Sequence, residues 1–410
     1  MTVLTAQGDA VALPDGIVGH AFDSDNHYYE ATDAFTRHIE PAMAKRAMQW
    51  AEVNGRQRLL VGGQINRFIP NPLFDPVAKP GSLDEYFRGR NPHEKDMRAL
   101  FGDLEPIRPE YRSRDARLAV MDDQGLAGCF LFPTLAVGME ESLSHDPPAL
   151  VAAFRAFNRW LDEDWGFAYQ ERIFAAPLIT LVDPDAAVAE LEWALGRDAR
   201  VVCVKGGPVR TATGRTSPGD RRFDPFWARV NEAGVTVGIH SGDAGYSRYL
   251  DDWEPTGSFE AFRHTPLRQV LSADRPPYET MAALICQGIF DRFPRVRVAS
   301  IEAGAQWVPI LAKKLKKAYG QNPSGFASDP VQTFRDHIWV APFYEDDLSE
   351  IRDVLGLDQM LFGSDWPHAE GLTDPLSFVS DLRRCNFNDD EIRTIMVDNA
   401  LCLIEPAPRP

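Results

Sequence analysis

Short apolar, β-branched runs alternate along the chain with stretches that carry apolar residues at helical spacing. Parallel α/β folds repeat this β-then-α unit, and eight such units predict a closed (β/α)8 TIM barrel. The predicted strands are 18–25, 127–132, 173–180, 200–205, 235–240, 296–302, 337–341 and 360–365. The predicted helices are 148–171, 184–196, 223–233, 280–291 and 306–319.

Two connections are longer than a βα crossover needs. About a hundred residues separate the first two predicted strands and include the Pro-rich run IPNPLFDPVAKPG. We therefore predict that 55–112 is an inserted cap segment over the barrel mouth, and that 242–278, after the fifth strand, is an extended loop on the same face. The barrel domain is predicted at 18–400, between an N-terminal extension (1–17) and a C-terminal tail (401–410).

Composition places the chain among ordinary globular proteins. It has 410 residues, of which 44% are hydrophobic and 25% charged, and no long apolar run predicts a membrane span. A net charge of -17 argues against nucleic-acid binding, which needs a basic face. The cysteines are isolated and odd in number, which favours reduced core residues in a cytoplasmic protein. They are Cys129, Cys203, Cys286, Cys385 and Cys402.

Metal-ligand residue types stand at the carboxyl ends of four predicted strands. Asp25 and His27 end the first strand, and side chains two apart on a strand point to one face. His240 ends the fifth strand, Glu302 the sixth and Asp365 the eighth. Because all strand ends of a barrel meet at one mouth, these five residues predict a single metal site.

Four motifs resemble the amidohydrolase-related family, in the branch that includes aminocarboxymuconate-semialdehyde and other aromatic-acid decarboxylases. They are DSDNHYYE, GIHSG, SIEAGAQWVP and LFGSDWPHAEG, and the resemblance extends over about 18–400. It implies that Asp25 and His27 replace the family's His-x-His pair and that His240 is the strand-five ligand. It also implies that Asp365 is the strand-eight ligand and acts as a base.

The chain departs from the family pattern at two positions, and both departures replace imidazole by a carboxylate. Asp25 stands where the hydrolases have His, and Glu302 where the decarboxylases carry a catalytic His. With one divalent ion the five ligands would carry about -1, and with two about +1. Such ligands suit Mn or Fe at least as well as Zn, so one or two ions of any of these metals fit. Glu30 and His368, just beyond their strands, are further candidates for ligation, ligand orientation or loop hydrogen bonds.

Three residues are predicted to contact the substrate. Lys205 ends the fourth strand, where it could carry a charge for the substrate, form a carboxylated bridge between two metals, or be structural. Arg67 belongs to the inserted segment, and Trp307 follows the sixth strand. Trp307 is one of several aromatic residues expected to make an apolar, stacking mouth. The others are Tyr28, Tyr29, Phe68, Trp253 and Trp366.

The leading hypothesis is a metal-dependent hydrolase or decarboxylase acting on a small, partly apolar organic acid or amide. A metal-activated water would react, Asp365 would carry the proton, and His368 or Arg67 would orient the substrate. The absence of a strand-six His favours hydrolysis. The alternatives are a binuclear non-haem Fe or Mn/Fe oxygenase on the same barrel and a non-catalytic partner subunit. The expected partners are the small-molecule substrate and a second copy in a homodimer.

Overall fold

A computed structural model describes residues 2–4, 10–69, 71–91, 93–95, 97–255, 265–272 and 275–408. Its central strands form two parallel sheets. One has the order β3–β7–β8 and the other β15–β14–β13–β10–β9. The strands are β3 (Ala21–Tyr28), β7 (Leu126–Pro133), β8 (Ile173–Ala175), β9 (Leu178–Ile179), β10 (Val201–Lys205), β13 (Thr236–His240), β14 (Arg297–Ile301) and β15 (Ile338–Val340).

Further backbone hydrogen bonds connect the two sheets. On the β8–β9 side, Ala176 N donates to Leu131 O of one sheet over 3.0 Å, and Cys203 N of the other sheet donates to Pro177 O over 2.9 Å. On the other side, the segment 360–366 lies between β15 and β3: Leu361 N donates to Val340 O, and Ser24 N donates to Phe362 O, each over 2.8 Å. This segment is the predicted eighth strand, and it forms single bridges in place of a regular ladder.

Close packing against β3 explains part of this irregularity. A Cβ atom at Gly363 would lie 2.6 Å from Cβ of Asp25, so only glycine permits this approach of the two backbones. Two residues later Asp365 has φ 55°, which turns the chain out of the extended conformation.

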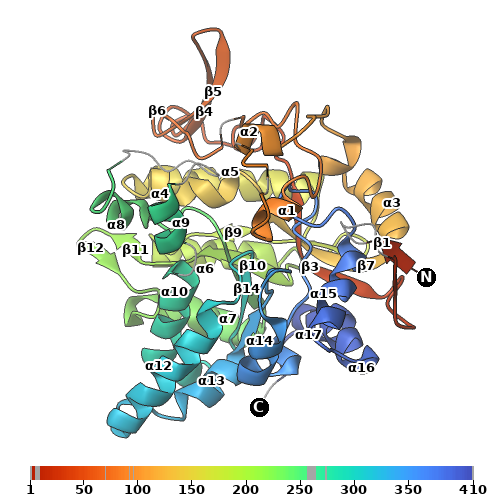
Figure 1. Cartoon of the computed structure of the whole chain (residues 1–410). Coiled ribbons are helices and arrows are strands. Elements are labelled where there is room, and N and C mark those ends of the chain that lie inside the picture. The colour runs from red at the N-terminus through yellow and green to blue at the C-terminus, as the bar shows by residue number, and fades with distance from the viewer. Residues whose placement is uncertain are drawn as a thin grey trace.

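Helices pack around the sheets, as Figure 1 shows. Several begin at an Asp cap followed by Pro: the Asp146 side chain accepts from Ala149 N, and that of Asp183 accepts from Ala186 N. The helices that follow strands are α5 (Pro147–Asp164), α6 (Pro184–Leu195), α7 (Asp224–Ala233), α10 (Arg275–Cys286), α11 (Ile289–Arg292), α12 (Trp307–Gln321), α13 (Pro330–His337) and α14 (Leu348–Leu355). The others near the barrel are α3 (Arg114–Gln124), α4 (Met139–Leu143), α15 (Phe378–Arg384), α16 (Asp389–Arg393) and α17 (Asn399–Ile404).

The long connection after β3 contains an antiparallel unit that projects from the body at the top of Figure 1. It consists of β4 (Met48–Val53), β5 (Arg56–Val61) and β6 (Gln64–Ile65), followed by the short helices α1 (Asp84–Phe87) and α2 (Met97–Leu100). The connection after β13 contains α8 (Ser247–Asp251) and α9 (Pro266–Ser272). Residues 256–264 and 273–274 of the predicted extended loop lie outside the described part of the chain.

Both ends of the described chain are attached to the body. Near the N-terminus, β1 (Thr2–Leu4) pairs with β2 (Ala10–Ala12) as an antiparallel hairpin. Near the C-terminus, Arg297 donates to Cys402 O and Glu405 O, each over 2.6 Å, and Arg295 donates to Ala407 O. Two arginines of the body therefore bind carbonyl groups of the predicted C-terminal tail (401–410) at Cys402, Glu405 and Ala407.

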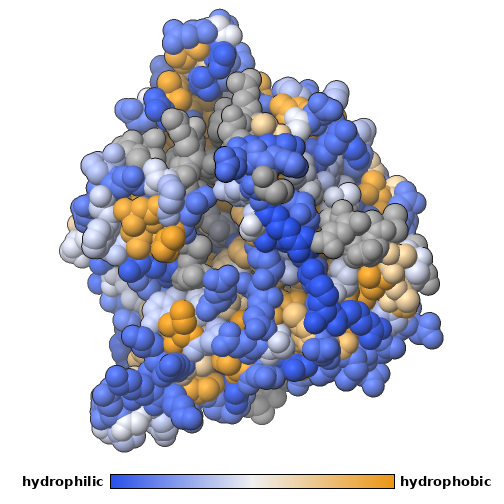
Figure 2. Space-filling view, viewed as in Figure 1, coloured by the Kyte–Doolittle hydropathy of each residue, from blue (hydrophilic) through white to orange (hydrophobic). Residues whose placement is uncertain are grey.

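The surface in Figure 2 is mostly hydrophilic, with separate apolar patches. Within the described ranges, every helix is too short or too polar to cross a bilayer. Of the five free cysteines, Cys129 and Cys203 are buried in the core, whereas Cys286 and Cys402 are exposed and Cys385 is half-buried. The expectation that the cysteines are core residues is thus correct only for those on β7 and β10.

Candidate metal centre

Strand β3 carries a polar sequence, yet all of its residues are buried. Asp23 explains how this is possible. Its carboxylate accepts from Ser364 N (2.9 Å), from Ser364 Oγ (2.5 Å) and from Asn26 Nδ2 (2.8 Å). Burial raises the pKa of Asp23 to about 6, although these hydrogen bonds oppose the rise. Asp23 therefore joins β3 to the segment that carries Asp365.

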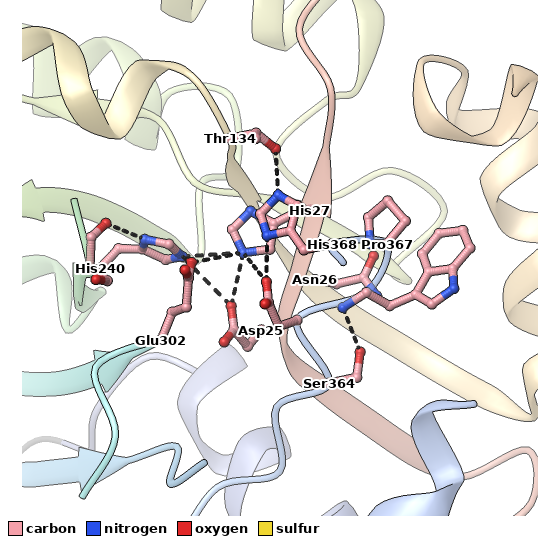
Figure 3. A network of polar contacts seen from close by, with 12 residues as sticks. Asp25, Asn26, His27, Thr134, His240, Glu302, Ser364, Pro367 and His368 are labelled. Atoms are coloured by element: carbon pink, nitrogen blue, oxygen red, sulfur yellow. Dashed lines mark hydrogen bonds and ion pairs between the residues drawn. The ribbon is translucent and has the colours of Figure 1, made fainter. Parts of the chain in front are cut away.

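His27, at the end of β3, lies at the centre of the polar cluster in Figure 3. Its Nε2 atom is 3.1 Å from Asp25 Oδ1, 3.3 Å from Glu302 Oε2 and 3.3 Å from Asp365 Oδ1. A single ring nitrogen can donate one hydrogen at most, so it cannot satisfy three carboxylates by hydrogen bonding.

His240, at the end of β13, faces the same point. Its Nε2 atom is 3.1 Å from Glu302 Oε2 and 3.3 Å from His27 Nε2. Its Nδ1 atom lies 2.7 Å from the carbonyl oxygen of Ser241. Because a carbonyl only accepts, Nδ1 carries the hydrogen, and neutral His240 presents the lone pair of Nε2 to the cluster.

His368 completes the cluster from beyond the eighth segment. Its Nδ1 atom is 2.5 Å from Asp365 Oδ1, and its Nε2 atom is 2.8 Å from Thr134 Oγ1. The His368 ring lies against that of His27, with centroids 4.0 Å apart. The structure therefore brings together Asp25, His27, His240, Glu302, Asp365 and His368 (Figure 3).

The pKa values of the two ligand histidines on β3 and β13 report strong negative charge. Burial alone would lower the pKa of His240, but Glu302 and Asp25 outweigh it and raise this pKa to about 10. The pKa of His27 is raised in the same way, against burial, by hydrogen bonds to Asp25 and Glu302. A positive charge is thus strongly favoured where these side chains meet.

The other two shifts come mainly from burial. Burial raises the pKa of Asp365 well above its ordinary value, and the neighbouring Glu302, Glu370 and Asp25 raise it further. Burial lowers the pKa of His368 well below its ordinary value, and the nearby His27 adds to this effect. His368 is therefore a neutral imidazole with a nitrogen available for coordination.

These donors fit a divalent metal ion. Carboxylate oxygens and neutral imidazole nitrogens are ligands for Zn, Mn and Fe, and ligand atoms from two overlapping sets of four residues lie within 4.8 Å of one another. Two of the carboxylates stand on left-handed backbone, with φ 49° at Glu302 and φ 55° at Asp365. Non-glycine residues seldom adopt this conformation, and such strain concentrates at functional sites.

Three other predicted residues, Glu30, Arg67 and Trp307, are not among the clustered side chains. Glu30 accepts from Leu135 N (2.8 Å) and Ala136 N (3.0 Å), so its carboxylate is occupied by a loop. Arg67 is exposed in the connection after β6. Trp307 is completely buried; its indole N–H donates to Gly304 O, and its ring packs on Phe334.

Most of the aromatic residues expected at the mouth are core residues as well. Tyr28, Tyr29, Phe68 and Trp366 are all buried. Trp253, in contrast, is 63% exposed. The described rings therefore do not form one aromatic mouth: Tyr28 packs on Trp165, Tyr29 on Phe74 and Trp366 on Tyr111.

A cavity adjoins the cluster at His240. Lys205 and Glu140 contribute its charged groups, and its volume is about 30 Å³. The Lys205 ammonium lies 3.7 Å from Glu141 Oε2 and 3.3 Å from the carbonyl of Pro208, with the side chain only 9% exposed. The other lining residues are mostly apolar: Ala136, Val137, Phe154, Leu178, Cys203, Val204, Gly206, Gly242 and Ala244.

Sequence reasoning missed the buried Arg117 of α3. Its guanidinium donates to Asn26 Oδ1, to His27 O (2.7 Å) and to Glu110 O (2.9 Å), and it stacks on the Trp366 ring at 4.6 Å. These contacts hold the backbone of two ligand-bearing segments. In the sequence Arg117 is one charged residue of a polar helix, and nothing there distinguishes it from a surface arginine.

Comparison with known proteins agrees with this geometry. The amidohydrolase family model matches residues 96–404. The crystal structure of an amidohydrolase from Mycobacterium avium subsp. paratuberculosis K-10 is similar, with 46% sequence identity and a TM-score of 0.89, over 94% of this chain and 99% of that chain.

Two decarboxylases share the fold at low sequence identity. A dihydroxybenzoic acid decarboxylase from Polaromonas sp. JS666, with bound manganese and the inhibitor 2-nitroresorcinol, is 18% identical. The alignment covers 79% of this chain and 93% of that chain, with a TM-score of 0.55. A 5-carboxyvanillate decarboxylase from Novosphingobium aromaticivorans DSM 12444, complexed with manganese and 4-hydroxy-3-methoxy-5-nitrobenzoic acid, is 15% identical. There the coverage is 95% and 96%, with a TM-score of 0.54.

The matched segment of the family model spans most of the chain and includes four of the six clustered residues, His240, Glu302, Asp365 and His368. The alignment with the mycobacterial structure covers 94% of the chain. The chain belongs to the amidohydrolase family and is a metal-dependent enzyme of the hydrolase or lyase type.

Proposed function

We propose that this enzyme hydrolyses or decarboxylates a small, partly apolar organic acid or amide. One observation carries the proposal: His27 Nε2 has three carboxylate oxygens within 3.3 Å, at the carboxyl ends of parallel strands where catalytic residues of this fold gather. Hydrolysis is favoured over decarboxylation, because β14 presents Glu302 where the resembling decarboxylases carry a catalytic His.

Asp25, His27, His240, Glu302 and Asp365 would hold the metal. When bound, a divalent ion in such a site polarises a substrate oxygen or lowers the pKa of water. Asp365 would accept or return the proton, because burial and the neighbouring acids raise its pKa well above the ordinary value and so favour its protonated form. His368, 2.5 Å from Asp365, keeps that carboxylate oriented.

The cavity beside His240 is the proposed substrate pocket. Its apolar walls suit a partly apolar substrate, and Lys205 would contact a polar or anionic group from one side. Arg67 stays a prediction as a substrate contact, since it lies exposed in the long connection after β3. The proposal also assumes one closed barrel of eight strands. The two sheets would be joined into this barrel by the backbone hydrogen bonds of residues 360–366 on one side and of residues 176–177 on the other.

Manganese is the first metal to test. Three of the five proposed ligands are carboxylates, which suit Mn at least as well as Zn. The two decarboxylases that share the fold were crystallised with manganese.

Metal removal and reconstitution test the proposal. The chelated protein should lack activity in a screen of aromatic and aliphatic amides, esters and carboxylic acids, and Mn²⁺, Fe²⁺ or Zn²⁺ should restore it. Hydrolysis is read by product titration, and decarboxylation by release of CO₂. A protein that binds none of the three ions, or that keeps full activity without them, would rule the proposal out.

The oxygenase hypothesis concerns the same cluster. Mixed Glu, Asp and His ligands motivate it, since two-metal sites that activate O₂ use them. Oxygen uptake by the Fe²⁺-loaded enzyme with substrate, measured with an electrode, would favour it over hydrolysis.

A further inference from the structure

The cavity beside His240 has a charged group in its wall that the proposed reaction does not use, the carboxyl of Glu140. Glu140 is the second residue of the short helix α4 and is only 5% exposed. The Thr180 hydroxyl donates a hydrogen bond to it. Because the two oxygens of a carboxylate together accept about four hydrogen bonds, Glu140 keeps accepting capacity for a group that enters the cavity.

A second carboxylate that is equally buried shows what a purely structural role requires. Glu190 on α6 is 6% exposed, and Arg159 Nη1 donates to it over 2.6 Å. Within the described ranges, Glu140 forms no ion pair with a Lys or Arg side chain, since the nearby Lys205 ammonium lies 3.7 Å from Glu141 instead. A buried carboxylate without an ionic partner is costly, so a donor that reaches it is bound favourably.

The pKa of Glu140 agrees with this situation. Burial raises it to about 7, the charge of Glu141 contributes to the rise, and Lys205 opposes it. A hydroxyl or amino group that donates to the ionised carboxylate would offset part of the effect of burial, whereas a methyl group or an anion would not.

The charged groups around this wall also favour a donor. Lys205 and Arg215 supply two positive charges, and Glu141 pairs with both. Asp243 is buried near the same three groups, and Glu140 adds a further carboxyl. Three carboxyls therefore oppose two bases, so this part of the cavity suits a neutral or positive donor better than a second anion.

The wall that carries Glu140 is held in place from two sides. Glu30 accepts from Ala136 N over 3.0 Å, and Val137 O accepts from Asp243 N over 3.2 Å. The segment that leads into α4 is thus fixed both to the end of β3 and to the loop after β13. A wall fixed in this way needs little reorganisation when a ligand binds, which favours selective recognition.

The size of the cavity limits what Glu140 can contact. Its volume is about 30 Å³, and a single water needs roughly 10–15 Å³ of such space. One short polar group therefore fits beside Glu140, whereas a ring does not. The apolar side chains of Phe154 and Leu178 line the same space and would contact the carbon atoms that carry this group.

We propose that Glu140 determines substrate specificity by accepting a hydrogen bond from a hydroxyl or amino group of the substrate in the cavity beside His240. The inference rests on the proposed function and names its substrate class: a small organic acid or amide that carries a hydroxyl or amino group in addition to its reacting group. Glu140 is assigned to substrate binding only.

Three probes of similar size test this inference without any turnover. They are 4-hydroxybutanoate, 4-aminobutanoate and pentanoate, which share a carboxylate and a flexible apolar chain and differ in the terminal group. Their dissociation constants for the full-length protein are measured by ligand-observed NMR titration. We expect at least one of the two donors to bind about tenfold more tightly than pentanoate, and the tighter one identifies the preferred group.

Equal affinities of the three probes, or binding of none of them, would overturn the inference. The result is independent of the metal-reconstitution experiment. A preference for the donors in a protein that stays inactive with every metal would overturn the proposed reaction and leave Glu140 a binding residue. An active enzyme without the preference would leave the reaction standing and overturn the role of Glu140.

Two variants assign the preference to Glu140. Glu140→Leu should remove it for both donors without weakening pentanoate, a selective change that a general loss of structure would not produce. Glu140→Gln keeps an accepting oxygen and loses the charge, so it should weaken 4-aminobutanoate by about tenfold and 4-hydroxybutanoate much less.

The control is Glu190→Gln, which changes a buried carboxylate whose partner is Arg159. It should lower stability and leave the relative affinities of the three probes unchanged. A wild-type preference in both Glu140 variants would overturn the inference. If Glu140→Leu does not fold, Glu140→Gln and the wild-type affinities decide the question.

Discussion

Two clusters of charged side chains lie next to each other at the carboxyl ends of the strands, and they differ in how their charges are balanced. In the cluster of Glu141, Lys205 and Arg215, the single carboxylate pairs with both basic groups: Arg215 Nη1 lies 3.0 Å from it and Lys205 Nζ 3.7 Å. In the ligand cluster of Figure 3, carboxylates face imidazole nitrogens and one another.

This difference in charge partners distinguishes a structural ion cluster from a metal site. Burying charge costs several kcal/mol unless the charges are paired, so a group of buried carboxylates without a Lys or Arg partner favours the binding of a cation. The Glu141 carboxylate has two cationic partners, whereas the described ion pairs of Asp25, Glu302 and Asp365 are all with histidines. Perturbing each cluster should therefore produce a different kind of defect.

The largest effect is expected from His27→Ala. This substitution removes the nitrogen nearest to three carboxylates, so it should abolish metal binding and reduce activity to background. In the wild type, metal at a hundred times its Kd should add about 2.7 kcal/mol to the free energy of unfolding, and in the variant nothing. Calorimetry with and without Mn²⁺ measures this. His38→Ala, a surface histidine paired with Glu163, is the control and should behave as wild type.

Arg117→Met should come next, with a loss of stability. It leaves two buried acceptors, Asn26 Oδ1 and His27 O, and the half-buried Glu110 O without this donor. We expect the free energy of unfolding in urea to fall by about 3 kcal/mol. Arg114→Met, on the same helix and against the exposed face of Tyr169, serves as the control and should cost under about 1 kcal/mol. Equal effects of the two variants would mean that Arg117 does not support the ligand segments.

The smallest of the three effects is expected in the balanced cluster. Glu141→Gln removes the partner of Lys205 and Arg215 and should lower the free energy of unfolding by about 2 kcal/mol, with metal content unchanged. Glu192→Gln, which affects an exposed pair with Arg229, should cost under about 1 kcal/mol. A loss of bound metal in Glu141→Gln would contradict the division of the two clusters into structural and metal-binding groups.

Much of the fold was predictable because it depends on local patterns. The apolar runs of β7, β10, β13, β14 and β15 are buried on both faces of parallel sheets, and such strands have continuous hydrophobic sequences. The eighth strand was the exception. The close approach of Gly363 to Asp25 and the positive φ of Asp365 break its ladder, and neither is visible in a pattern of apolar residues.

The residues of the site also fall into those that the sequence predicted and those that it did not. Asp25, His27, His240, Glu302 and Asp365 could be proposed from sequence because each lies near or just after the end of a strand, and strand ends converge in this fold. Trp307 was a poor choice as a substrate contact, because an aromatic residue after a strand can equally turn into the core, as this one does. Asp23, Thr134 and Arg117 were missed, since their partners are up to 341 residues away in the chain.

By itself, the sequence determined the alternation of strands and helices, the family and the residue types that gather at the strand ends. Only the tertiary structure decided that Lys205 is balanced by Glu141, and that His368 presents Nδ1 to Asp365 because Thr134 binds its other nitrogen. The physical reason is that periodicity and propensity act between neighbours in the chain, whereas the protonation, orientation and charge balance of a buried group depend on whatever side chains the fold places within a few ångströms of it.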